Sequence, residues 1–174
     1  MAASVEFSES NGAGETVTNA ITNANFGSAD VPNLVTTDHP VIINTFSFRK
    51  YWRFHLTALG GSTQVDSLLP YKLSGAYVTG EQIFSNCPNN VNVWMNLSYA
   101  TPDNSSLIAN VEVINTTPTG PFLGIQNSSA GSFKVANGNV PGFSNYWVVQ
   151  VKTTAATPVG PVNQKVLGIQ YNEF

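Results

Sequence analysis

Charged side chains are scarce in this sequence. Asp, Glu, Lys and Arg make up 10% of its 174 residues, against roughly 25% in an ordinary globular protein. A nucleic-acid-binding protein needs a basic patch that neutralises several phosphates. Here the net charge is −3, and the only basic cluster is Arg49, Lys50 and Arg53. We therefore expect no nucleic-acid partner, and we expect these three residues to lie on the solvent side of one strand.

Cysteine and long hydrophobic runs are also nearly missing. Cys87 is the only cysteine, so no disulfide can form within the chain. This favours synthesis and assembly inside a cell, or an exterior protein that needs no bridges. No apolar run is long enough to span a bilayer, and Met1 is not followed by a basic region and an apolar stretch. We expect neither a membrane partner nor a secretory signal.

Residues that usually carry catalysis or hold a metal are few and scattered. His39 and His55 are the only histidines, whereas a metal site needs several ligands at suitable spacing. Cys87 has no basic neighbour in the sequence that would activate it as a nucleophile. The sequence contains no phosphate-binding loop, dinucleotide fingerprint or nucleophile elbow. We predict a protein that is not an enzyme, with no catalytic, cofactor-binding or metal-binding residues. The ten carboxylates leave a glycoside hydrolase open as a third class of function.

What the sequence does contain is a repeated alternation of apolar and polar residues. The clearest run is Arg49–Leu59, in which Trp52, Phe54 and Leu56 face one way while Tyr51, Arg53 and His55 face the other. Val65–Leu69 comes after it, beyond a glycine pair, and is expected to be its partner strand. Further runs of this kind cover residues 91–99 and 107–114, which we interpret as a hairpin, and residues 144–152 and 166–171.

The stretch Ser144–Tyr171 is expected to close the fold. Its two runs are expected to pair on either side of a connection that contains Pro158 and Pro161, because proline cannot donate to a strand ladder. In each run one face is apolar and the other mostly polar, as in an antiparallel sheet over a core. The apolar faces are Trp147, Val149 and Val151 in the first run and Leu167, Ile169 and Tyr171 in the second.

No segment shows a sustained helical period. The strand-like runs therefore predict an all-β fold: a single-domain antiparallel β-sandwich of seven to nine strands, immunoglobulin-like or jelly-roll. We assign residues 16–174 to the sandwich and residues 1–15 to an N-terminal arm or edge strand.

The N-terminal segment Met1–Thr18 has few apolar anchors, and the break at Asn11–Gly14 separates most of it from the rest of the chain. We expect it to lie partly outside the sandwich and to add a strand to a neighbouring subunit, with Val5 and Phe7 in side-chain pockets. The alternative is a disordered terminus.

Trp94 is the third candidate for an assembly contact. It lies opposite the apolar face of its run, among Asn92, Asn96 and Ser98. A tryptophan in such a position can contact a ligand, including a sugar ring, or another subunit.

Three stretches resemble small β-sandwich virion proteins of tailed bacteriophages. They are residues 25–34, residues 74–81, and residues 161–165 before the closing strand. The resemblance implies a structural role in head decoration, in the neck or in the tail. The step Thr157–Gly160 is also similar to bacterial immunoglobulin-like surface modules.

These observations predict a non-enzymatic structural protein that self-assembles or decorates a larger particle. The expected setting is a bacteriophage virion assembled in the host cytoplasm, with copies of the chain and other structural subunits as partners. Low charge favours this role because it removes the repulsion that keeps subunits apart. The alternative is a carbohydrate-binding or cell-surface-binding module, or a subunit of an extracellular filament.

Overall fold

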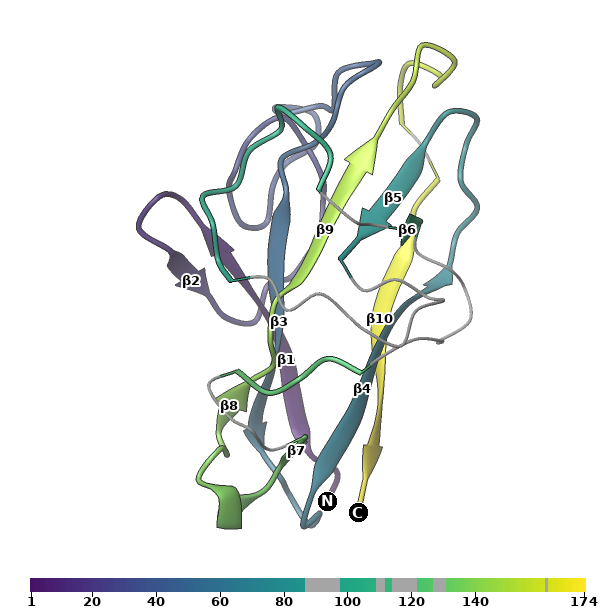
Figure 1. The fold of residues 1–174 in the computed structure, drawn as a ribbon. Helices are drawn as coiled ribbons and strands as arrows, with labels where there is room; N and C mark the ends of the chain where they lie inside the picture. Colours follow the sequence, from purple (N-terminus) through teal and green to yellow (C-terminus); the bar gives the residue numbers. More distant parts are fainter. Residues whose placement is uncertain (87–97, 109–111, 114–121, 127–130, 162) are drawn as a thin grey trace.

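The chain folds as a sandwich of two antiparallel β-sheets (Figure 1). The computed structural model describes residues 1–86, 98–108, 112–113, 122–126, 131–161 and 163–174. The larger sheet has the order β2-β1-β3-β9-β5-β6, with β8 beside β3, and the smaller sheet has the order β10-β4-β7. The elements are β1 (Ser4–Asn11), β2 (Thr16–Thr18), β3 (Lys50–Ala58), β4 (Val65–Ser74), β5 (Gln82–Ser85), β6 (Glu112–Val113), β7 (Ser132–Phe133), the 3₁₀ helix η1 (Val135–Asn137), β8 (Gly142–Phe143), β9 (Trp147–Lys152) and β10 (Val166–Glu173).

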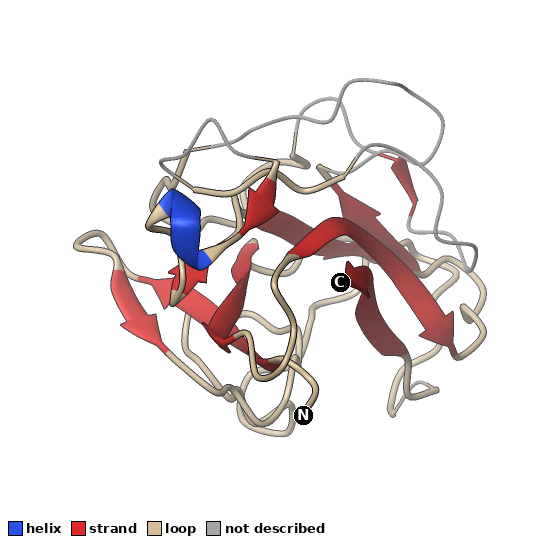
Figure 2. Ribbon diagram, turned by 90° about the horizontal axis from the view of Figure 1, so that it is seen from below, coloured by secondary structure: helices blue, strands red, loops and turns tan. Residues whose placement is uncertain are grey.

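The prediction of a single-domain all-β antiparallel sandwich is confirmed. The described residues form ten strands rather than seven to nine. Four of them, β2, β6, β7 and β8, are two or three residues long and too short to show an alternation. Figure 2 shows strands and loops throughout, and η1 is the only helix in the described part of the chain. No helix there is long and apolar enough to cross a membrane.

The main core lies between the two sheets, and the predicted inward faces are confirmed. The larger sheet contributes Trp52, Phe54 and Leu56 from β3 and the alternate residues Trp147, Val149 and Val151 from β9. The rings of Trp52 and Trp147 meet edge to face, with centroids 5.6 Å apart, a favourable aromatic geometry. The smaller sheet covers them with residues of β4 and β10, namely Leu68, Leu167, Ile169 and Tyr171.

Two predicted strand pairings are wrong. The run Val65–Leu69 belongs to β4, which pairs with β10 and not with β3. The runs at 144–152 and 166–171 belong to different sheets, because β9 pairs with β3 and β5. Between the described strands, the chain crosses from one sheet to the other after β3, β4, β6, β7 and β9. Alternation specifies which side chains face the core, but both sheets bury a face, so it does not specify the partner strand.

The outer side of the larger sheet is also covered. Tyr51, Tyr146 and Val148 form a second buried cluster with Ile108, and Tyr99 packs against it. We predicted that the outer side of the run 144–152 is mostly polar and left uncovered. This is wrong, because Tyr99 and Ile108 pack over Tyr146 and Val148 on that side. The predicted hairpin of residues 91–99 and 107–114 lies mostly outside the described residues.

The N-terminal segment forms part of the larger sheet. β1 pairs with β3 from Ser4 opposite Ala58 to Ser10 opposite Tyr51, and β2 borders only its last three residues. The prediction that this segment lies partly outside the sandwich is therefore wrong for β1. In addition to the apolar anchors Val5 and Phe7, β1 has polar residues at its end, Ser8–Asn11, that are buried in the folded protein. Of the two forms expected for residues 1–15, the structure shows a strand.

Candidate functional site

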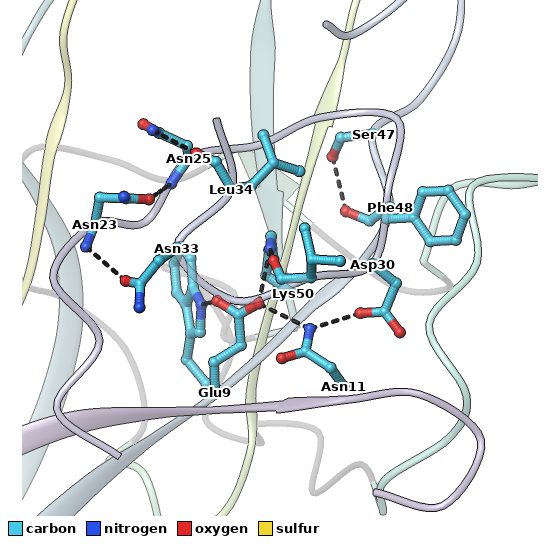
Figure 3. Close-up of polar contacts among 12 residues, drawn as sticks. Glu9, Asn11, Asn23, Asn25, Asp30, Asn33, Leu34, Ser47, Phe48 and Lys50 are labelled. Atoms are coloured by element: carbon cyan, nitrogen blue, oxygen red, sulfur yellow. Dashed lines mark hydrogen bonds and ion pairs between the residues drawn. The ribbon is translucent and has the colours of Figure 1, made fainter. Parts of the chain in front are cut away.

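A buried ion pair joins β1 to β3. Glu9 and Lys50 are each only 1% exposed, and Lys50 Nζ lies 2.7 Å from Glu9 Oε1 (Figure 3). Glu9 Oε2 accepts a hydrogen bond from Trp52 Nε1 at 2.9 Å, and Lys50 Nζ also donates to the Val31 carbonyl at 2.8 Å. A buried charge without a partner is very unfavourable, so these contacts are what make the pair tolerable in the core.

An amide and a second carboxylate extend this pair. Asn11 Nδ2 donates to Glu9 Oε1 at 2.9 Å and to Asp30 Oδ1 at 2.6 Å (Figure 3). Asp30 Oδ2 accepts from the Gly12 backbone N–H at 2.7 Å. Asn11 Oδ1 is buried and has no hydrogen-bond partner, an arrangement that costs free energy. We call Glu9, Asn11, Asp30 and Lys50 the β1–β3 polar cluster.

Strand alternation produces this cluster. In β1, Glu9 and Asn11 continue the face that begins with Val5 and Phe7, and in β3, Lys50 precedes Trp52 on the core face. The cluster was not predicted, because Lys50 stands between two other basic residues and such a group favours a solvent face. A signal was nevertheless present in the sequence: one basic and one acidic residue each fall in phase with the apolar positions of a strand.

The long loop between β2 and β3 is held against this cluster. Asp30 and Val31 supply its contacts, and Leu34 is buried. A Cβ at Gly27 would lie 2.2 Å from the His39 carbonyl oxygen, so only glycine fits where the loop folds back on itself. The ring of Phe26 packs 5.5 Å from that of Trp52. Polar contacts and packing together make this loop part of the folded unit.

The other two members of the basic cluster are also paired. The Arg53 guanidinium lies 4.4 Å from the Phe143 ring centroid and 3.7 Å from a Glu15 carboxylate oxygen, and Arg53 is buried. Arg49 forms an ion pair with Asp103 at 3.2 Å. The prediction that all three basic residues face solvent is therefore wrong for Lys50 and Arg53.

A second buried ion pair links the loop before β5 to the start of β10. Lys165 Nζ contacts Glu81 Oε2, which also accepts from the Val78 backbone N–H at 3.1 Å. Nearby, Lys72 Nζ lies 5.1 Å from the Tyr77 ring centroid. Burial, with a smaller contribution from Glu81, raises the pKa of Tyr77 to about 12. The charges of Lys165 and Glu81 neutralise each other, so this pair offers no site to a charged ligand.

The outward side of the smaller sheet has an apolar part, bordered on β10 by the exposed polar residues Gln170 and Asn172. Along β4, Leu68, Pro70 and Lys72 are buried while the residues between them point outward, and on β10 the outward residues begin with Val166. Leu73 is 58% exposed and Val166 41%. We call this surface the β4–β10 outer face; it consists of Leu69, Tyr71, Leu73 and Val166.

The three residues predicted as assembly contacts have different positions. Val5 is exposed near the start of β1. Phe7 packs against the core of its own chain, with its ring 6.5 Å from that of Trp147, so its side chain has a partner without a neighbouring subunit. Trp94 lies outside the described residues, and its contact stays a prediction.

The described residues contain no group of three or more His, Cys, Asp or Glu side chains placed to hold a metal ion. His55 stacks on Phe143 at 4.1 Å, and its Nδ1 lies 2.7 Å from Glu6 Oε1. Comparisons with models of protein families, with curated proteins and with solved structures found no match to this chain.

Proposed function

We propose that this protein is a non-enzymatic structural subunit that assembles with copies of itself and with other structural subunits. The observation that carries the proposal is the β4–β10 outer face. Large apolar side chains on an exposed sheet surface are unfavourable in water, and a contiguous patch of them is typical of a protein–protein interface. The nearest polar neighbour of this face on β10, Gln170 opposite Leu69, is uncharged.

The edge of the same sheet supports the proposal. Among the described strands, β10 pairs only with β4, so one of its sides has no strand partner. Monomeric proteins usually protect such an edge with lysine, proline or a bulge that turns it away. β10 contains no lysine or proline, and its only charged residue is Glu173 at its end. Its register against β4 shifts between Val166 and Leu167 and between Gln170 and Asn172, so the regular part of the edge is residues 167–170. We propose that a second copy of the chain packs here.

The proposed setting is a bacteriophage virion, as a head decoration protein or as a neck or tail component. Three stretches of sequence that resemble such virion proteins support this, together with the low charge of the chain. The carbohydrate-binding alternative depends on Trp94 and stays a prediction. Glycan binding by the isolated protein that is lost in Trp94→Ala would favour that alternative over a structural role.

Sedimentation of the full chain over a range of concentrations tests the assembly proposal. We expect the wild type to form oligomers, and we expect Leu73→Glu and Val166→Glu to sediment as monomers, because each places a charge in the proposed interface. Val159→Glu is the matched control. Val159 is 87% exposed and lies in the loop before β10, so this variant adds the same charge outside the face and should assemble like the wild type.

Two results would contradict the proposal. One is a wild-type chain that remains monomeric at every concentration. The other is oligomers that persist unchanged in Leu73→Glu and Val166→Glu, with the folded state of each variant confirmed by circular dichroism.

A further inference from the structure

The β1–β3 polar cluster brings together an amine, a carboxyl group and a carboxamide in the interior of the protein. Lys50 Nζ and Asn11 Nδ2 both donate to the same oxygen, Glu9 Oε1, at 2.7 and 2.9 Å. Hence one carboxylate oxygen touches both the amine and the amide. We propose that Lys50 and Asn11 become joined by an isopeptide bond, with Glu9 as the catalytic acid–base residue. The proposal does not depend on the assembly function.

The sheet fixes the two reacting residues as neighbours. β1 and β3 are antiparallel, and Ser10 pairs with Tyr51, so continuing this register by one residue places Asn11 opposite Lys50. Side chains directly opposite in an antiparallel pair have Cβ atoms about 4.5–5.5 Å apart. Two groups held in this way react as one molecule, which removes most of the entropic cost of bringing them together.

The reaction requires a neutral amine and a protonated carboxyl group, and the two groups can exchange the proton between them. An amine attacks a carbonyl only when it is neutral, and a general acid must carry a proton. Moving one proton from Lys50 Nζ to Glu9 Oε1 gives both forms at once without a change in total charge. The 2.7 Å contact between Lys50 Nζ and Glu9 Oε1 gives the proton a direct path between the two groups.

The other contacts of the cluster hold the reacting groups in place. The Val31 carbonyl accepts from Lys50 Nζ, and Trp52 Nε1 donates to Glu9 Oε2, so both ends of the pair are fixed. A half-turn of the Asn11 amide exchanges Nδ2 with Oδ1 and breaks the hydrogen bond from Nδ2 to Asp30 Oδ1. The carbonyl oxygen, which is buried without a partner, then faces the Glu9 carboxyl group and can accept its proton.

The step balances without a further reactant. The Nζ lone pair of Lys50 forms a bond to Cγ of Asn11, and Oδ1 takes the proton of Glu9. As the carbonyl re-forms, Oδ1 returns its proton to Glu9 and the bond between Cγ and Nδ2 breaks. A proton from Nζ reaches Nδ2 through Glu9, and one molecule of ammonia leaves. Glu9 ends with the proton it had after the initial transfer, and it can donate that proton to the new amide oxygen.

Peptide mapping of the folded full-length protein tests the bond. No Lys or Arg precedes Arg49, so trypsin leaves residues 1–49 as one peptide, and a free Lys50 allows cleavage on both of its sides. We expect residues 50–53 to remain attached to residues 1–49, with a combined mass lower by one ammonia than the sum of the two peptides. Release of unmodified peptides from residues 1–49 and 51–53 after prolonged incubation of the folded protein would overturn the proposal.

The variants Glu9→Gln, Lys50→Arg and Asn11→Ala should all lose the linked peptide. The wild-type map decides the proposal even if one of these variants does not fold. Lys50→Arg also separates the bond from cyclisation of Asn11 onto the Gly12 nitrogen, which releases ammonia too. A loss of ammonia that survives in Lys50→Arg, together with release of residues 51–53 from the wild type, would assign the loss to that cyclisation and contradict the isopeptide bond. A folded Glu9→Gln protein that still forms the link would show that Glu9 is not the acid–base residue.

Discussion

Phe54 lies at the centre of the main core, with its ring centroid 5.2 Å from that of Tyr171 and 6.1 Å from that of Phe133. The substitution Phe54→Ala removes these contacts and leaves a cavity, which typically costs about 3–5 kcal/mol. We expect that loss in the free energy of unfolding, measured by denaturant titration. Phe122→Ala is the control: Phe122 is exposed, so its loss should change stability by no more than about 0.5 kcal/mol. Equal effects of the two variants would contradict the assigned core.

The raised pKa values of two tyrosines lead us to expect that the free energy of unfolding depends on pH in the alkaline range. Burial raises the pKa of both Tyr77 and Tyr99 to about 12, and in Tyr99 the nearby carboxylates Asp30 and Glu15 raise it further. In the unfolded chain both phenols lose their proton near pH 10. Between these values the unfolded state binds fewer protons, so the free energy of unfolding falls as the pH rises from about 10 to about 12.

Denaturant titrations across this pH range measure that decline. We expect a shallower slope in Tyr77→Phe and in Tyr99→Phe, because each removes one group that titrates differently in the two states. The same slope in the wild type and in the double variant would contradict the assignment.

At the residue scale, the period of two predicts which apolar side chains are buried but not which charged ones are. Trp52, Phe54 and Leu56 were predicted from alternation alone. Lys50 occupies the next position on the same face, yet a buried lysine is so unfavourable without a partner that its charge favoured a solvent position. The partner, Glu9, lies 41 residues away in sequence, and only the pairing of β1 with β3 brings the two together.

At the scale of elements, β1 carries the largest change from the sequence prediction. It pairs with β3 along most of its length and supplies the carboxylate that neutralises Lys50. Deleting Met1–Gly14 removes both, and leaving one partner of a buried ion pair alone costs about 3–5 kcal/mol. We expect the truncated chain to lose its cooperative thermal transition, measured by circular dichroism.

Removal of Met1 and Ala2 alone is the control for this deletion. Both residues are exposed and precede β1, so the shortened chain should still fold. If the chain without Met1–Gly14 unfolds at the wild-type temperature, β1 does not stabilise the sandwich. That result would favour the N-terminal arm predicted from the sequence.

The elements themselves were more predictable than their pairing. The runs at 49–59, 65–69, 144–152 and 166–171 all contain strands of the structure. Their partners depend on where the connections cross between the sheets, and a connection such as residues 153–165 contains no local signal for the crossing. The long loop between β2 and β3 was equally unpredictable, because its order comes from Asp30, Val31 and Leu34 contacting other parts of the chain.

At the scale of the whole molecule, several charges lie inside while an apolar surface lies outside. Buried ion pairs hold Glu9, Lys50, Glu81 and Lys165, in a chain that has few charged residues to begin with. The β4–β10 outer face is correspondingly short of charge that would keep copies apart. The low charge of the sequence favoured assembly. Which surface would form the contact could be proposed only from the structure.

The most direct test of the proposed structural role is electron cryomicroscopy of the particle or filament from which the protein is isolated. The proposal predicts a regular array of copies, in which Leu73 and Val166 of each copy are buried against a neighbouring subunit. A chain found only outside any assembly, or an array in which these two residues face solvent, would contradict it.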